Sequence, residues 1–260
     1  MTLLHSSSES QPETQGWPVH EDYATDSGYL RPRGRVINAY DPLAHAELLS
    51  EVARVHEGDE KGLVEFARTW GLLGQEETTG IPPEHAESTN WVWGQATNVR
   101  MILKLQRYLV SGDREGLSSF LETYRDRLSA YPDAEYVVPV AEPWFPQLIP
   151  FSAEDPIKLS ESIVAHIINV NLGQLNYRLQ PQPWHLYPDI HCPYVAIYWH
   201  LTRVVMDGRP IAQCEECRSL FSVRDRRQRF CPPLPDWAGA KGSKCGAKHR
   251  KRRQRQKEGG

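Results

Sequence analysis

The sequence predicts a mainly α-helical body followed by a small C-terminal zinc module, and three observations lead to this prediction. Apolar side chains recur at helical spacing in several segments of the first 210 residues, with Asp-Pro pairs and glycines at the segment ends. Four of the five cysteines lie between residues 214 and 245. Residues 211–260 carry fourteen basic and five acidic side chains, whereas residues 1–210 carry sixteen basic and twenty-eight acidic ones. The two parts therefore differ in both chemistry and charge.

We divide the chain into three parts. Residues 1–30 are rich in Ser, Glu, Gln, Thr and Pro, and we expect them to be disordered because they offer little apolar surface to bury. Residues 31–209 are expected to form the mainly helical body, with or without a minor β-sheet. Residues 210–260 are expected to form the zinc module, treble-clef-like or ribbon-like, with a basic C-terminal helix or tail. Neither a signal peptide nor an apolar membrane-spanning stretch is recognisable, so we expect a cytoplasmic protein with no membrane partner.

The chain up to residue 90 is expected to contain a short strand at 35–40, a helix at 41–56, a second helix at 59–71 and a loop at 74–90. Asp41 and Pro42 predict the first helix, because an N-capping side chain followed by proline suits a first turn. The second helix has apolar residues at helical spacing up to Trp70 and glycines after it. We expect these two helices to form a helical hairpin.

The rest of the body is expected to contain three more long helices and one that follows a short strand. In order, the elements are a helix from about 92 to 110, an antiparallel helix at 117–128, an extended stretch at 133–151, a helix from 155 to 179, a brief strand at 184–187 and a helix at 193–208. Ile211 and Ala212 lead directly into Cys214 without a linker. We therefore expect the zinc module to be docked against the body.

The cysteines are the clearest functional signal. Cys214 and Cys217 form a C-x-x-C pair, a spacing that lets two thiolates on one turn reach a single tetrahedral ion. Cys231 follows an apolar run at 220–223 and a charged segment, which suggests a β-hairpin carrying the third ligand. A Pro- and Gly-rich insert of thirteen residues then returns Cys245 to the site. We predict a structural Zn²⁺ ion, because cysteines at this spacing in a reducing compartment favour metal binding over disulfides. The predicted ligands are Cys214, Cys217, Cys231 and Cys245, with His249 as the alternative to Cys245.

Basic side chains flank the predicted ligands on two sides. Affinity for nucleic acids comes largely from contacts of such side chains with phosphates and from the release of counterions. The alternative is a solvated run of charge that serves only solubility. The density of positive charge beside a zinc scaffold favours nucleic-acid binding, with DNA preferred over RNA as the partner. The predicted nucleic-acid-binding residues are Arg224, Arg226, Arg227, Arg229, Lys248, Arg250, Lys251, Arg252, Arg253 and Arg255.

The C-terminal segment also resembles a known family. Its C-E-E-C, Phe221, R-F-C and C-G-A-K-H-R-K-R-R-Q-R motifs resemble the CGNR-type zinc finger that closes many bacterial stress-induced transcription regulators. The family's Cys-Gly-Asn-Arg reads Cys-Gly-Ala-Lys at 245–248, and the gap between the last two cysteines is longer than expected. The motifs cover about forty residues, and a weaker likeness extends to 66–74 and 87–91. The resemblance implies DNA binding and transcription regulation by a protein whose body senses a ligand or binds a partner.

Two other classes of function are compatible with the sequence. An RNA- or ribosome-associated adaptor would use the zinc module as an anchor while the acidic body binds a protein. Enzymatic activity is not expected, because the chain lacks the G-x-S-x-G, H-E-x-x-H and P-loop motifs, although an enzyme with an unrecognised body pocket is a third option. Cys192 beside His191 is expected to be a buried structural cysteine. An HNH-type nuclease does not fit, since no His or Asn lies between Cys217 and Cys245.

Overall fold

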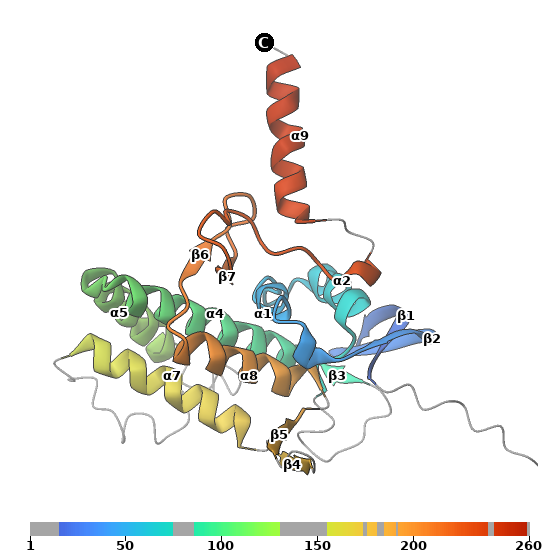
Figure 1. Cartoon of the computed structure of the whole chain (residues 1–260), viewed down its shortest axis with the longest axis horizontal. Helices are drawn as coiled ribbons and strands as arrows, with labels where there is room; N and C mark the ends of the chain where they lie inside the picture. The colour runs from blue at the N-terminus through green and yellow to red at the C-terminus, as the bar shows by residue number, and fades with distance from the viewer. Residues whose placement is uncertain are drawn as a thin grey trace, which may run out of the picture.

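The computed structural model describes residues 16–74, 86–130, 155–173, 176–180, 185–190, 192–238 and 242–258. This part of the chain is mainly α-helical, as predicted, with three small antiparallel sheets (Figure 1). The helices are α1 (Leu48–Val52), α2 (Glu60–Trp70), α4 (Thr89–Ser111), α5 (Arg114–Ala130), α7 (Pro156–Leu172), α8 (Pro193–Met206) and α9 (Lys244–Glu258), with 3-10 helices η1 (Pro42–Ala44) and η3 (Asp236–Ala238). The strands are β1 (Trp17–Asp26), β2 (Tyr29–Tyr40), β3 (Glu87–Ser88), β4 (Asn176–Gln180), β5 (His185–Asp189), β6 (Ile211–Gln213) and β7 (Leu220–Ser222).

The core of the body is built around α4, which packs against α1, α5, α7 and α8. Its N-cap is Ser88, whose side chain accepts a hydrogen bond from the backbone N–H of Trp91, and it ends at Gly112 in the left-handed conformation. Val92, Ile102 and many other apolar side chains of α4 are fully buried. A buried hydrogen bond of 2.6 Å from the Tyr198 hydroxyl to Gln95 joins α8 to this helix. The helices predicted at 92–110 and 117–128 are thus confirmed.

The helix predicted at 59–71 is α2. The Asp59 carboxylate accepts a hydrogen bond from the backbone N–H of Gly62, so Asp59 is the N-cap. The helix ends at Gly71, which has φ 75° and lies against β1: a Cβ atom there would be 2.5 Å from the carbonyl oxygen of Pro18. Glycine is required for both reasons. Other residues rarely adopt this backbone conformation, and no side chain fits in the space between residue 71 and the Pro18 carbonyl.

The prediction that residues 1–30 are disordered is wrong for residues 17–30. They form β1 and the start of β2, which pair as an antiparallel hairpin. Ser27 and Gly28 both have positive φ, 50° and 82°, as a two-residue type I′ turn requires. Three of the six apolar residues in this segment, Val19, Tyr23 and Leu30, are almost fully buried. Residues 1–15 lie outside the described part of the chain.

The helix predicted at 41–56 is divided into η1 and α1. Asp41 is the N-cap as expected, since its carboxylate accepts from the backbone N–H of Leu43. At His45 the backbone leaves the helical region, with φ −120° and ψ 77°, and the imidazole turns against the ring of Tyr40. Packing of this side chain therefore interrupts the helix. The short strand predicted at 35–40 is the end of β2.

Three further predictions are changed or lie outside the described residues. Of the loop predicted at 74–90, residues 75–85 are not described, while β3 pairs with the start of β2 and residues 89–90 belong to α4. The helix predicted to reach residue 179 ends at Leu172, and Leu179 belongs to β4. The strand predicted at 184–187 is β5, which pairs with β4. The extended stretch predicted at 133–151 lies outside the described residues.

The C-terminal module is docked on the body, as predicted. Strands β6 and β7 both contact α4, and β7 also contacts α1. Ile211 and Leu234, which flank the first three cysteines, are buried in the core of the body. Only α9 stands away from the rest, projecting outward from the module (Figure 1). Among the described helices, none combines the length and apolar character needed to cross a membrane.

Candidate metal centre and basic helix

The C-x-x-C pair lies in the connection of a β-hairpin. Strands β6 and β7 pair antiparallel, and the backbone N–H of Cys214 donates to the carbonyl of Ser219 at 2.9 Å. The N–H of Arg218 donates back to the carbonyl of Cys214, and Arg218 has φ 64°, which tightens the turn. The prediction of a hairpin that ends at Cys231 is therefore wrong: the hairpin is formed by the strands on either side of the first cysteine pair.

Cys231 and Cys245 reach the same place from two other elements. The backbone N–H of Glu215 donates to the carbonyl of Arg229 at 3.1 Å, which holds the segment before Cys231 beside the hairpin turn. Cys245 lies in the first turn of α9, where the Ser243 hydroxyl accepts a hydrogen bond from the N–H of Gly246. The positive end of the helix dipole stabilises a thiolate at such a position.

The four cysteines form one compact group. Their Sγ atoms all lie within 4.8 Å of one another, and Cys217 and Cys231 are 3.4 Å apart. A tetrahedral ion with bonds of about 2.3 Å has sulfur–sulfur edges of roughly 3.8 Å, so the observed spread fits one ion at the centre. Cys214, Cys231 and Cys245 are buried, and Cys217 is partly exposed. The predicted ligand residues are therefore brought together, and they could hold a metal ion.

The electrostatics of the four thiols favour a cation. A hydrogen bond with the Cys231 thiol lowers the pKa of Cys217 to about 3, whereas the same hydrogen bond and then burial raise the pKa of Cys231. Burial, and then the negative charge of Cys217, raises the pKa of Cys245 to about 12. Protein groups alone thus favour a thiolate at Cys217 and disfavour ionisation of Cys231 and Cys245. A divalent ion would allow all four to be thiolates, because it supplies the charge that they repel in its absence.

His249 is not part of this group. Its ring packs against Phe230 with 5.1 Å between ring centroids, and its Nδ1 atom lies 3.7 Å from the carboxylate of Glu216. The same carboxylate forms an ion pair of 3.0 Å with Arg252. His249 thus packs α9 against the segment before Cys231 and lies near Glu216 of the C-x-x-C turn.

The body contributes a positive charge beside the thiols. Arg54, at the end of α1, forms an ion pair of 2.8 Å with Glu51, and both side chains are mostly buried. Burial lowers the pKa of Arg54, but the charge of Glu51, and further that of Cys217, outweighs burial and raises it. The guanidinium therefore lies within electrostatic reach of the metal centre.

The predicted nucleic-acid-binding residues fall into two groups. Three of them form ion pairs within the protein: Arg224 with Glu47, Arg229 with Glu215 and Arg252 with Glu216. The other seven are exposed and form no ion pair in the part of the chain that the structure describes. They are Arg226, Arg227, Lys248, Arg250, Lys251, Arg253 and Arg255.

Helix α9 is a solvent-exposed rod that starts at the metal centre. It has fifteen residues, eight of them Lys or Arg, and every side chain from Arg250 to Glu258 is exposed. Cys245 and Gly246 are its only buried residues. No apolar stripe on α9 packs against the body, in agreement with the sequence.

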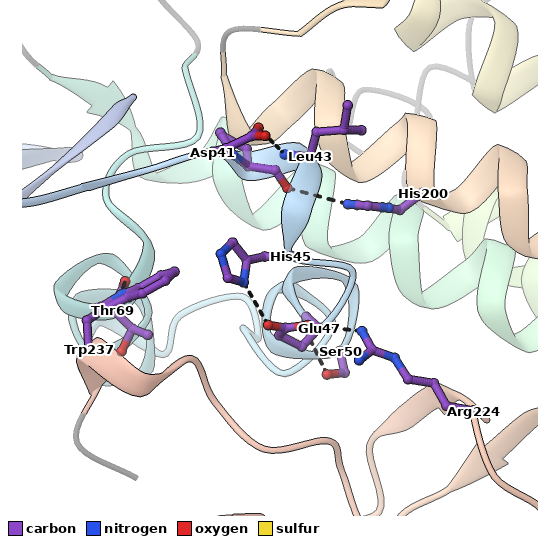
Figure 2. Close-up of polar contacts among 10 residues, drawn as sticks. Asp41, Leu43, His45, Glu47, Ser50, Thr69, His200, Arg224 and Trp237 are labelled. Atoms are coloured by element: carbon purple, nitrogen blue, oxygen red, sulfur yellow. Dashed lines mark hydrogen bonds and ion pairs between the residues drawn. The ribbon is translucent and has the colours of Figure 1, made fainter. Parts of the chain in front are cut away.

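The particular contacts that the insert makes with the body were not predicted. Trp237, within the insert expected to loop out, donates its indole N–H to the carbonyl of Thr69 at 3.1 Å (Figure 2). Its ring packs against Tyr40, His45 and Trp70 of the body. The sequence did contain a signal for this contact, namely a tryptophan within a Pro- and Gly-rich insert. Large aromatic side chains are usually buried at least in part, so this one indicates a segment that packs against something.

Cys192, expected to be a buried structural cysteine, is 1% exposed and precedes α8. It packs tightly against the end of the segment after α2, where a Cβ atom on Gly74 would lie 2.6 Å from the Cys192 Cβ. Close packing of this kind leaves no room for a substrate at the thiol.

Comparison of the chain with family models, curated proteins and solved structures gave no match, so the geometry of the site carries the functional argument.

Proposed function

We propose that this protein is a zinc-finger protein that binds double-stranded DNA through its C-terminal module and regulates transcription. The proposal begins with the metal. Four thiolates are soft ligands that favour Zn²⁺ in a tetrahedral site, and a set of four protein ligands leaves no open position for a substrate. The zinc is therefore structural, and its role is to hold the hairpin turn, the Cys231 segment and α9 together.

The arrangement of the ligands supports a treble-clef-like module. Two ligands lie in the turn of the β6–β7 hairpin, and the last lies in the first turn of a helix. In such an arrangement the metal fixes the base of the helix to the hairpin, so that the remaining turns extend as a rigid element. The resemblance of the motifs to CGNR-type fingers points in the same direction.

The exposed basic helix α9 is the observation that carries the proposal. Its fifteen residues span roughly 22 Å at 1.5 Å per residue, and a helix fits a major groove about 12 Å wide. Lys248, Lys251 and Arg255 follow one another at spacings of three and four residues, so like charges face each other along the helix. Contacts with phosphates would relieve this repulsion. A polyanion is thus the partner that this helix fits best.

The dependence of affinity on salt tests the proposal. With about five phosphate contacts, the slope of log affinity against log salt on duplex DNA is expected near −4 to −5. The double variant Lys251→Gln/Arg255→Gln should make the slope shallower by roughly 2. The matched control, Arg31→Gln/Arg33→Gln, removes the same charge from exposed positions on β2 and should leave the slope unchanged. Fluorescence anisotropy with a labelled duplex measures both.

Two results would contradict the proposal. Equal slopes for all three proteins would show that α9 is only a solvated helix. Clearly tighter binding to RNA than to DNA at matched salt would favour the RNA- or ribosome-associated adaptor instead.

A further inference from the structure

A pocket of about 300 Å³ lies at the boundary between the body and the zinc module. We call it the seam pocket. Its walls come from α1 and the segment before it, from α8, and from β7 with the residues that follow, including Pro232 next to the ligand Cys231. The pocket therefore touches both the body and the module, and its volume is at the small end of the range for ligand sites.

Positive charge predominates in the polar part of the lining. Three guanidinium groups line the pocket, those of Arg203, Arg209 and Arg224, against the single carboxylate of Glu47. Arg209 donates hydrogen bonds from two of its nitrogens to the carboxylate of Asp207. Arg224 donates a hydrogen bond from one of its nitrogens to the carboxylate of Glu47. Arg203 is exposed and forms no ion pair with any described residue. The N–H donors of the Arg203 guanidinium are therefore available to bind an anion.

Glu47 is held in place as an anion by its neighbours. Its side chain is only 12% exposed, and it accepts hydrogen bonds from His45 at 2.9 Å and from Arg224 at 3.0 Å (Figure 2). Burial alone would raise the pKa of Glu47, but these hydrogen bonds lower it below its ordinary value. A fixed negative charge in the wall disfavours a doubly charged ligand such as phosphate and tolerates a singly charged one better.

Apolar side chains make up much of the rest of the lining. Leu43, Ala46 and Trp199 are partly exposed there, whereas Leu49, Val204 and Phe221 are almost fully buried. An anion without apolar surface would leave Leu43, Ala46 and Trp199 in contact with water, whereas an alkyl or aryl group would cover them. The lining thus combines guanidinium groups with apolar surface.

We propose that the seam pocket binds a small organic carboxylate whose apolar part covers Trp199 and whose carboxylate is bound by Arg203 and the free nitrogens of Arg224. The ligand bridges α8 of the body and Arg224, which follows β7 of the module. Because Arg224 lies in the chain between the predicted metal ligands Cys217 and Cys231, occupancy holds the module, and with it α9, against the body. Binding to the pocket is independent of the proposed function; only its use as a regulatory signal for DNA binding rests on it.

The test uses the full-length zinc-loaded protein and 4-fluorophenylacetate, observed by the fluorine NMR linewidth. Its neutral analogue, 4-fluorophenylacetamide, keeps the shape and removes the charge. We expect saturable binding of the acid, at least tenfold weaker binding of the amide, and displacement of the acid by hexanoate and benzoate but not by inorganic phosphate. Arg203→Gln should weaken binding of the acid by roughly tenfold and leave the amide unchanged, because a hydrogen bond to a charged group is lost.

Arg226→Gln is the matched control, since Arg226 is an exposed arginine of the module that does not line the pocket. It should bind the acid as the wild type does. Equal binding of acid and amide, equal losses in the two arginine variants, or no saturable binding of any of the three carboxylates would each overturn the proposal.

A second measurement tests the bridging role. The rate at which zinc passes to a colorimetric chelator should fall when the acid is present at saturation, in the wild type but not in Arg203→Gln. Binding without any change in this rate would show that the ligand does not hold the module. Neither assay contains nucleic acid, so failure of the DNA-binding proposal and failure of this one are distinguishable.

Discussion

The guanidinium of Arg224 lies 3.0 Å from the carboxylate of Glu47, although 177 residues separate them in the chain. Arg224 belongs to the C-terminal module and Glu47 directly precedes α1 of the body (Figure 2). The carboxylate is largely buried, whereas the arginine is about half exposed, at 54%. This residue was predicted to contact nucleic acid, yet its position assigns it to the contact between the two parts of the protein.

The contribution of Glu47 to stability should be lost in acid. Its pKa in the folded protein lies below the ordinary value of 4.5, because the hydrogen bonds from His45 and Arg224 outweigh burial. Such a group stabilises the fold fully above the unfolded value, and the contribution disappears as the pH falls through the folded value. Glu47→Gln should lower the free energy of unfolding by roughly 1 kcal/mol at about pH 7 and by less at about pH 3.

Chemical denaturation at the two pH values measures this difference. Glu21→Gln is the control, because Glu21 pairs with Arg35 on the surface, where both side chains are well exposed. It should change stability little at either pH. A Glu47→Gln effect of equal size at both pH values would contradict the assignment of an ionised, hydrogen-bonded carboxylate.

The metal content should be one zinc ion per chain. Cys231→Ser should abolish tight binding, since three thiolates and a hydroxyl do not form the closed tetrahedral site. Because structural zinc supplies folding free energy directly, a chelator should unfold β6, β7 and α9 while the helices around α4 remain. Metal analysis and far-ultraviolet circular dichroism report the two effects. A stoichiometry well below one ion in freshly reduced protein, or unchanged binding in Cys231→Ser, would rule out the four-cysteine site.

His249→Ala should leave zinc binding nearly intact, whereas Cys245→Ser should abolish it. The imidazole packs on Phe230 and lies outside the group of sulfur atoms, so its removal costs packing and no metal bond. Competition with a chromophoric chelator compares the two variants directly. If both lose zinc equally, the histidine is a ligand and Cys245 is not sufficient.

Arg54→Gln should accelerate zinc loss to a chelator by roughly tenfold, the lower end of the effect of residues that surround metal ligands. Four thiolates around Zn²⁺ leave a net negative charge, and the guanidinium of Arg54 is the nearby positive group that acts on Cys217 and Cys231. Arg54→Lys should restore most of the wild-type rate. Arg68→Gln is the control, because Arg68 pairs with Asp22 of β1 and not with a residue beside the cysteines. It should have no effect. Equal rates in Arg54→Gln and Arg68→Gln would show that the charge of Arg54 does not reach the site.

Much of the helical body was predictable because its signals are local. Asp59 and Gly71 bound α2, Ser88 and Gly112 bound α4, and Asp155 caps α7, and each of these residues acts on backbone groups within a few positions of itself. The spacing of Cys214 and Cys217 is equally local, since it needs only one turn. Periodicity failed where the environment changed: beyond Leu172 the apolar residues that continue the helical pattern belong to a strand.

The errors have a common physical cause. In the segment at 17–30, apolar residues such as Val19 and Tyr23 stabilise a strand only because α2 and β2 cover them. His45 interrupts a helix because aromatic rings from residues 40, 70 and 237 surround it. No pattern within a short window contains this information.

The sequence by itself determined the helical segments, the cysteines at metal-ligand spacing and the basic character of α9, because propensity, capping and ligand chemistry belong to residue types. Only the tertiary structure decided that the four sulfur atoms meet, that Arg224, Arg229 and Arg252 are engaged within the protein, and that a charged pocket opens between body and module. The reason is that ion pairing, burial and cavity shape depend on distances between residues remote in sequence, which are set when the two parts pack together.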